Sequence, residues 1–224
     1  MNKLVIFGSS DVAQIAHYYF STESDYEVVA FTVDRNYVKG AEFCGLPVVP
    51  FENVIKHFSP DRHDFFVALG YKKLNVFRKQ RFLAAKKLGY KLVSFISPRA
   101  TVLNDGKIGE NCFIFEDNTI QPFVTIGDNV TLWSGNHIGH HSVIHDHTFI
   151  ASHAVISGGV EIGEQCFVGV NATLRDRIKI GDRCVIGAGA LLLADAAPDG
   201  VYSGTATERS KVDRKSTRLN SSHR

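Results

Sequence analysis

The stretch that decides the fold spans residues 125–168 and reads TIGDNVTLWSGNHIGHHSVIHDHTFIASHAVISGGVEIGEQCFV. Within it an Ile, Leu or Val returns at every sixth position, and the same column extends without an insertion from Ile96 to Leu192. An amphipathic helix repeats about every 3.6 residues and an isolated strand about every 2, so neither explains this spacing. The pattern predicts a triangular coil of three short strands per roughly 18 residues, with successive coils stacked as parallel β-structure.

Small residues occupy most of the positions that lie four residues after each aliphatic one, and they predict a second set of inward side chains. Three of them, Cys112, Cys166 and Cys184, fall in one column, and we expect buried, reduced thiols that act as small apolar groups. Asn118 and Asn136 share another inward column, where stacked amides can hydrogen-bond along the coil axis.

The residues before the repeat alternate between strand-like and helix-like patterns. We expect strands at 3–8, 27–34, 64–70 and 90–96, and helices after SSD (residues 9–11), near 51–58 and over 72–88. This alternation predicts a small parallel sheet with a Rossmann-like start. The helix over 72–88 contains seven Lys and Arg residues, which we interpret mainly as a solvated face.

The predicted fold is therefore an α/β N-terminal Rossmann-like domain followed by a parallel β-helix of hexapeptide repeats. We place the first domain at residues 1–97 and the β-helix with its closing loop at 98–212. The last residues, 213–224, read DRKSTRLNSSHR and lack the repeat, so we interpret them as a non-native or disordered tail.

Composition narrows the class of protein. The 224 residues include 25 Lys and Arg and 23 Asp and Glu, for a net charge of +2, and 44% are hydrophobic. These values exclude wholesale disorder and give no general reason to expect a nucleic acid or a membrane as partner. No apolar run approaches the ~20 residues of a membrane span, and the four cysteines show neither zinc nor disulfide spacing. We expect a cytoplasmic protein.

The predicted carboxyl ends of the first three strands offer groups that suit a nucleotide. Ligands of open α/β sheets bind at this edge, and backbone N–H groups at a helix start can hold a phosphate. The loop after the first strand has no full GxGxxG motif, and a tight turn with a capping Asp remains the alternative interpretation. The candidate substrate-binding residues are Gly8, Ser9, Ser10, Asp34, Gly70 and Lys72.

Histidine is the unusual residue in this sequence. Six of the ten histidines lie within one predicted coil: His137, His140, His141, His145, His147 and His153. None falls at an inward position, so we expect them to face out or to lie at corners. His140 is our candidate for a catalytic base, with His141 as the alternative. One coil further, Gly158 and Gly159 remove side chains beside this pair and predict a hollow for a substrate or cofactor.

A zinc site is the competing interpretation of the histidines. His140 and His145 have a spacing that suits hexapeptide-repeat carbonic anhydrases, which use three histidine ligands. Asn104 lies where that family has an earlier histidine, and no histidine occurs between His63 and His137. Because this chemistry usually requires three histidines, we expect no metal.

The order LVIFGSSD, ALGYKK, SFISPRATV and then hexapeptide repeats with a histidine belt resembles the hexapeptide-repeat sugar acyltransferases. These are related to sialic acid O-acetyltransferase and to the bacillosamine-pathway and perosamine-type nucleotide-sugar N-acetyltransferases. The resemblance, over residues 2–210, implies a left-handed β-helix and a homotrimer. It also implies acetyl-CoA between adjacent β-helices and a nucleotide-sugar acceptor held by the N-terminal domain, for surface polysaccharide or glycan biosynthesis.

The resemblance also implies roles for particular residues. The base falls on His140, and cofactor contacts fall on Gly158, Gly159, Val170, Ala188 and Gly204. Two positions depart from the family pattern. Some relatives have an acidic residue after the base, where this chain has His141, and their terminal loop often reads Gly-x-Pro-Ala, where this chain has GTAT from Gly204.

The implied reaction is acetyl transfer to an amino sugar of the 4-amino-4,6-dideoxy type. A sugar amine must lose a proton to attack a thioester, and an imidazole, with an ordinary pKa of about 6.5, suits that task. A hydroxyl acceptor uses the same base. The alternatives are therefore a sialic-acid-type O-acetyltransferase and a non-catalytic hexapeptide-repeat scaffold that binds a nucleotide.

Overall fold

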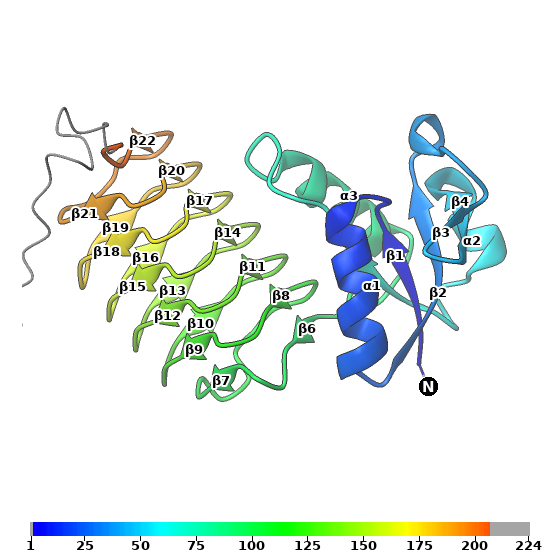
Figure 1. Cartoon of the computed structure of the whole chain (residues 1–224), viewed down its shortest axis with the longest axis horizontal. Coiled ribbons are helices and arrows are strands. Elements are labelled where there is room, and N and C mark those ends of the chain that lie inside the picture. Colours follow the sequence, from blue (N-terminus) through cyan, green and yellow to red (C-terminus); the bar gives the residue numbers. More distant parts are fainter. Residues whose placement is uncertain (1, 207–224) are drawn as a thin grey trace, which may run out of the picture.

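The computed structural model of the chain describes residues 2–206, and Figure 1 shows an α/β domain beside a long stack of coils. The predicted fold class is confirmed, because a mixed α/β sheet domain precedes three parallel sheets of very short strands. The predicted tail, 213–224, lies outside the described residues. Among residues 2–206, no helix has the length and apolar character needed to cross a bilayer.

The sheet of the α/β domain has five strands, and all neighbours are parallel except β3 and β4. Its order is β3 (Glu42–Phe43), β4 (Leu46–Pro50), β2 (Tyr26–Val33), β1 (Asn2–Phe7) and β5 (Asp64–Val67). The predicted strands at 3–8, 27–34 and 64–70 are present with shifted ends, whereas β3 and β4 were not predicted. The prediction of a strand over 90–96 is wrong, because only Leu92 bridges to Phe65 and the chain then enters the β-helix.

Helices pack against both faces of this sheet. They are α1 (Asp11–Glu23), α2 (Val54–His57) and α3 (Val76–Lys87), with 3-10 turns η1 (Arg35–Tyr37) and η2 (Phe51–Asn53). α1 buries Ala13, Ala16 and Phe20 against the sheet. α3 begins later than predicted because Lys73 to Asn75 adopt a left-handed turn, with φ between 50° and 62°.

The β-helix consists of three sheets whose strands follow one another around each coil. The seven-stranded sheet contains β6 (Phe95–Ile96), β8 (Phe113–Ile114), β11 (Thr131–Leu132), β14 (Phe149–Ile150), β17 (Phe167–Val168), β20 (Val185–Ile186) and β22 (Val201–Tyr202). The six-stranded sheet contains β7 (Thr101–Val102), β9 (Thr119–Ile120), β12 (His137–Ile138), β15 (Val155–Ile156), β18 (Thr173–Leu174) and β21 (Leu191–Leu192). The four-stranded sheet contains β10 (Thr125–Ile126), β13 (Val143–Ile144), β16 (Glu161–Ile162) and β19 (Lys179–Ile180).

The predicted repeat sets the core of the coils. Partners in neighbouring coils are 18 residues apart, as in Thr125 with Val143, and the aliphatic column is buried from Ile114 to Leu192. The three column cysteines are buried and unpaired, as predicted. The predicted amide ladder is wrong in detail, because Asn118 donates to the main-chain carbonyls of Phe115 and Trp133 rather than to another amide.

The α/β domain packs on the outer face of the seven-stranded sheet, which is unusually aromatic. Tyr19 of α1 contacts the rings of Phe113 and Phe115, and Tyr71 packs against Phe149 and Phe167 two coils further along. Such ring pairs prefer the tilted and edge-on arrangements seen here. Figure 1 shows the consequence, with the α/β domain on the side of β8, β11 and β14 and with β12 and β13 on the other side of the stack.

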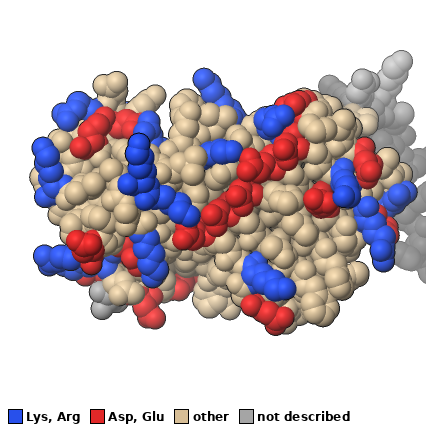
Figure 2. Space-filling view, turned by 180° about the vertical axis from the view of Figure 1, so that it is seen from behind, with Lys and Arg blue, Asp and Glu red and all other residues tan. Residues whose placement is uncertain are grey.

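α3 lies against the corner where each coil passes from the four-stranded to the seven-stranded sheet. That corner carries an acidic residue in five successive coils: Glu110, Asp128, Asp146, Glu164 and Asp182. Lys86 pairs with Glu110 at 2.6 Å, and Lys79 pairs with Glu164 at 3.0 Å. Figure 2 shows acidic side chains as a diagonal band across this face, with basic groups on both sides. The predicted solvated face of this helix is therefore partly an interface.

Candidate active site

The predicted nucleotide loops meet at one edge of the α/β sheet. Gly8 follows β1 and donates its N–H to the carbonyl oxygen of Thr32, and Ala68 after β5 donates to Phe7. Gly8 has a φ of 137°, and a Cβ there would lie 2.6 Å from the Ala68 carbonyl oxygen, so only glycine fits this approach. Because β2 and β5 flank β1 on opposite sides, this edge is the switch point where such sheets bind ligands.

The other predicted substrate residues lie around this edge and differ in their exposure and in their contacts. Ser9 is half-buried and Ser10 is exposed at the start of α1, while Gly70 lies against the Val12 side chain. Asp34 follows β2, but its carboxylate pairs with Arg81 at 3.0 Å, and burial raises its pKa. Lys72 is exposed further along the loop that leads to α3.

A cavity of about 380 Å³ opens beside this edge, between α1 and the corner where coils pass from the seven-stranded to the six-stranded sheet. Its lining residues are Asp11, Gln14, Ile15, Tyr18, Tyr19, Phe115, Glu116, Trp133 and Ser134. Glu116 accepts hydrogen bonds from the Tyr19 hydroxyl at 2.6 Å and the Ser134 hydroxyl at 2.7 Å. Burial raises the pKa of Glu116, but these two bonds, its own main-chain N–H and the charge of Arg99 together leave the pKa below its usual value. The cavity thus combines a carboxylate with aromatic walls, and none of its residues was predicted as a site residue.

A larger groove, of about 530 Å³, lies away from every predicted site residue. It is lined by Tyr26, Lys86, Lys91, Leu92, Val93, Ser94, Ile108, Gly109, Glu110 and Asp128. Lys86 in its lining already pairs with Glu110 and Asp128 across the domain contact. We therefore place the candidate active site at the smaller cavity and the histidine corner.

His140 lies at the corner between the six-stranded and four-stranded sheets. It is exposed, and its main-chain N–H donates to Gln121 Oε1 at 2.8 Å. A Cβ on Gly158 would lie 2.6 Å from Nε2 and Cε1 of the His140 ring. The predicted hollow is therefore filled by the imidazole of His140 itself. Because Gly158 has no side chain, the ring can pack directly against its backbone.

The predicted cofactor residues divide between two corners of the coil. Val170 and Ala188 are exposed at the corner between the seven-stranded and six-stranded sheets, and Gly204 lies against the Ala188 carbonyl oxygen. Gly158 and Gly159 lie at the other end of the six-stranded sheet, beside His140. The predicted catalytic and cofactor residues therefore lie along both edges of the six-stranded sheet, whereas the predicted substrate residues lie in the α/β domain.

The remaining histidines differ in their surroundings. His145 is exposed and pairs with Glu161 at 3.2 Å, and His153 is exposed at another corner. His147 lies at a corner, as expected, but it is buried beneath Phe82 of α3 rather than exposed. Its corner of the coil faces the α/β domain, and the repeat pattern of the coils does not indicate this contact.

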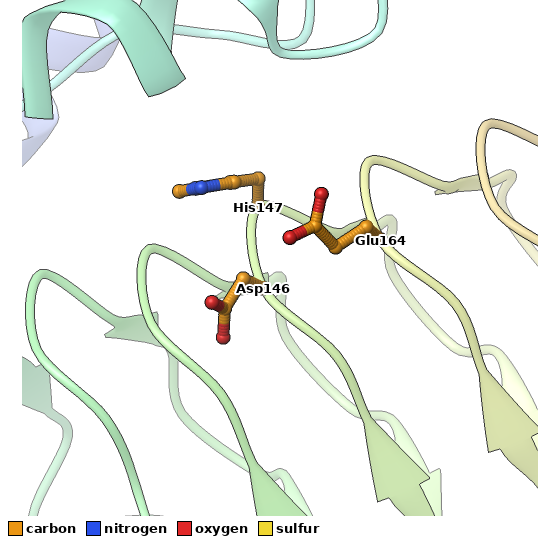
Figure 3. A group of neighbouring side chains, drawn as sticks. All are labelled: Asp146, His147 and Glu164. Atoms are coloured by element: carbon orange, nitrogen blue, oxygen red, sulfur yellow. The ribbon is translucent and has the colours of Figure 1, made fainter. Parts of the chain in front are cut away.

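Asp146, His147 and Glu164 form a group that has the composition of a metal site. Figure 3 shows Asp146 and His147 on one coil and Glu164 on the next, and one possible ligand atom of each lies within 4.8 Å of the others. Asn129 Nδ2 donates to His147 Nδ1 at 3.0 Å, so the imidazole proton is on Nε2 and neither nitrogen offers a free lone pair. Lys79 already neutralises Glu164. Each member of the group thus has its own partner, since Asp146 accepts a hydrogen bond from the main-chain N–H of Asp128.

Comparison with known proteins agrees with this architecture. The family described as bacterial transferase hexapeptide (six repeats) matches residues 105–140, 123–158 and 159–194. No sequence among the curated proteins matches the chain.

Two groups of solved structures share the fold over most of both chains. The acetyltransferase domain of PglB from Neisseria gonorrhoeae is 28% identical, with a TM-score of 0.80 over 91% of this chain and 97% of that one. The same domain has been solved in complex with acetyl coenzyme A, at 26% identity and a TM-score of 0.80 over 91% of this chain and 96% of that one. A mutant of perosamine N-acetyltransferase from Caulobacter crescentus, in complex with CoA and GDP-perosamine, is 23% identical, with a TM-score of 0.81 over 91% of this chain and 94% of that one.

The repeat register, the domain order and the match to the PglB acetyltransferase domain over nearly its full length lead to one assignment. Residues 105–194 match the bacterial transferase hexapeptide family, and the chain is similar in fold to hexapeptide-repeat acetyltransferases such as the PglB domain.

Proposed function

We propose that the protein is an acetyl-CoA-dependent N-acetyltransferase that acts on a nucleotide-linked amino sugar. One spatial relationship supports the proposal beyond the similarity to known acetyltransferases: an exposed imidazole lies at one edge of the six-stranded sheet, and a cavity with a carboxylate and aromatic walls lies at the other edge. The solved relatives support the substrate class, since one was solved with acetyl coenzyme A and another with CoA and GDP-perosamine.

The division of the site over two edges favours a groove between two copies of the chain. Each coil passes through about six residues between these corners, so at about 3.3 Å per residue they are separated by up to roughly 20 Å. A homotrimer, which the family resemblance implies, would place the His140 corner of one subunit against the cavity corner of the next. The active site is then complete only in the assembly.

The acceptor fits the α/β domain and its cavity. A diphosphate would bind at the N–H groups of Ser9 and Ser10, where α1 begins, with Lys72 available from the neighbouring loop. Asp34 would have to exchange its contact with Arg81 for a ribose or a base. The sugar would enter the adjoining cavity, where Trp133 offers a stacking face and Glu116 offers a carboxylate to an amine.

Acetyl-CoA fits the exposed line of small residues on the cavity corner. Val170 and Ala188 stand one coil apart, and Gly204 closes against the second of them, so backbone groups are accessible to a pantetheine arm. Gly158 and Gly159 of the neighbouring subunit would face the same groove. The thioester would then lie between the cavity and His140.

The reaction follows from this placement. The unprotonated nitrogen of His140 takes a proton from the sugar amine as the amine attacks the thioester carbonyl carbon. The C–N bond forms, the C–S bond breaks, and the imidazolium returns the proton to the departing CoA thiolate. Positioning two substrates in one groove supplies much of the rate enhancement, so no covalent enzyme intermediate is required.

A panel of nucleotide sugars tests the proposal. Free thiol released from acetyl-CoA is measured with GDP- and UDP-linked 4-amino sugars and with their 4-hydroxy counterparts, and mass spectrometry identifies the product. We expect acetyl-CoA-dependent thiol release and an amide product with at least one amino sugar. Turnover with hydroxy sugars alone would assign O-acetyl transfer, and the absence of both turnover and acetyl-CoA binding by calorimetry would assign a scaffold.

A further inference from the structure

His140 and His141 are paired through equivalent nitrogens. His140 Nδ1 lies 3.1 Å from His141 Nδ1, and the two rings are nearly perpendicular, at 87°. A neutral imidazole has one N–H donor and one acceptor nitrogen, so one of these atoms must donate and the other accept. The direction of this single bond decides which nitrogen of His140 is free for chemistry.

The two directions have opposite consequences. If His141 donates, His140 carries its proton on Nε2, and neither of its nitrogens can take a proton from an acceptor. If His140 donates from Nδ1, its Nε2 is unprotonated and serves as the base. After proton transfer the His140 imidazolium still donates to His141, now through a stronger, charge-assisted bond.

His141 is held in place independently of His140. Its ring packs on Phe123 of the preceding coil, with centroids 4.7 Å apart, and its main-chain N–H donates to the carbonyl oxygen of Pro122. Its backbone adopts a left-handed φ of 61°, as the corner requires. Since Gly158 lies against the other ring, each imidazole has a packing contact of its own in addition to the contact between the two rings.

We propose that His141 is the positioning residue of the active site, acting as a neutral acceptor that keeps the proton of His140 on Nδ1. The inference rests on the proposed function, because His141 can position the base only if His140 is that base. It differs from an acidic partner in one respect. A neutral acceptor orients the base without adding a negative charge beside it.

The pair makes activity sensitive to acid in a defined way. A proton on His140 removes the base, and a proton on His141 forces that ring to donate and blocks the base as well. The surroundings from neighbouring coils add little charge, since Gln121 and Phe123 lie on one side and Gly158 and Gly159 on the other. Beyond the glycines stand Asp176 and Arg177, and Arg177 packs on Gly159.

Three substitutions of His141 distinguish a positioning role from a purely structural one. His141→Phe keeps a ring against Phe123 but removes the acceptor, and we expect kcat/KM to fall about tenfold or more. His141→Gln restores an acceptor oxygen and should recover most of that loss. His141→Glu supplies an anionic acceptor, and we expect the acid limb of its pH–rate profile to move upward by about one unit. His145→Phe, on the same coil, is the matched control.

Nitrogen NMR of labelled histidine provides a readout that does not depend on turnover. We expect His140 to carry its proton on Nδ1 in the unmodified protein and on Nε2 in part of the His141→Phe population. A proton on Nε2 in the unmodified protein, or a Phe variant with unchanged kcat/KM and pH profile, would overturn the role of His141. If no acceptor supports turnover, the proposed function fails, and the NMR result still decides the pairing.

Discussion

The guanidinium of Arg78 donates to the main-chain carbonyl oxygen of Asn129 at 3.0 Å, from a helix of the α/β domain into a corner of the β-helix. Arg78 is buried, and its other contacts are the Thr131 hydroxyl and the Asn111 carbonyl oxygen. Burial lowers its pKa to about 10, so it remains charged at neutral pH. A charge held by main-chain oxygens fixes the position of the α/β domain on the coils.

Arg78→Met should destabilise the protein by about 3 kcal/mol or more, because it leaves buried carbonyl oxygens without donors. Urea unfolding followed by circular dichroism measures this free energy of unfolding. Lys87→Met, at an exposed position of the same helix, should change it by no more than about 0.5 kcal/mol. Equal stability of the two variants would mean that Arg78 does not join the domains.

His147 should make stability depend on pH. Burial, and then the Lys79 ammonium, lower its pKa from 6.5 to about 4. Below pH 6.5 the unfolded chain therefore binds a proton that the folded chain does not. Stability should be greatest above this pH and fall by roughly 3 kcal/mol as the pH drops towards 4.

The measurement is urea unfolding of the unmodified protein and of His147→Gln at several pH values. The difference between the two should shrink as the pH falls from 6.5 to 4, because glutamine does not titrate. His57→Gln, at an exposed position, should retain the full pH dependence. A constant difference between the unmodified protein and His147→Gln would exclude His147 as the source.

Gly158→Ala should reduce activity without reducing stability. The added Cβ would displace the His140 ring, and an exposed ring can move at little cost in stability. Because proton transfer needs positioning to a fraction of an ångström, we expect kcat/KM to fall about tenfold or more. Gly40→Ala, where nothing but a distant carbonyl oxygen faces the new Cβ, is the control for thermal stability and for kinetics. Unchanged kinetics would show that the close packing of His140 on Gly158 has no role in catalysis.

Sequence periodicity predicted the coils because every coil must place an aliphatic side chain on its axis, and Ile114 to Leu192 obey this without exception. The first strands of the α/β domain were predictable because β1 and β5 each contain a short buried apolar run, LVIF and FFV. The left-handed turn at Lys73 to Asn75 contains no glycine, so nothing in the sequence indicates that α3 starts late.

The candidate site was less predictable because it depends on contacts between distant segments. The cavity joins α1 to a corner about a hundred residues away, through Tyr19 and Glu116, and neither residue belongs to a motif. His147 follows the same spacing as the exposed corner histidines, and only the docked α3 buries it. His140 was predictable because its position in the repeat places it at an outer corner.

Mixed trimers test whether the active site is shared between subunits. His140→Asn removes the base, and Gln14→Trp fills the cavity from an exposed position of α1, so we expect either variant alone to be nearly inactive. Coexpression should restore roughly a quarter of the sites, because some pairs of neighbours combine an intact cavity with an intact His140. No recovery above the two parents would mean that one chain holds the complete site.

His140→Asn, assayed beside His145→Asn, tests whether His140 is the base in acetyl transfer. Thiol release from acetyl-CoA is followed with the best amino-sugar acceptor, and acetyl-CoA affinity is measured by calorimetry. We expect His140→Asn to lose turnover by at least about a hundredfold with unchanged acetyl-CoA affinity, and His145→Asn to retain turnover. Turnover by His140→Asn at the rate of the unmodified protein would contradict it.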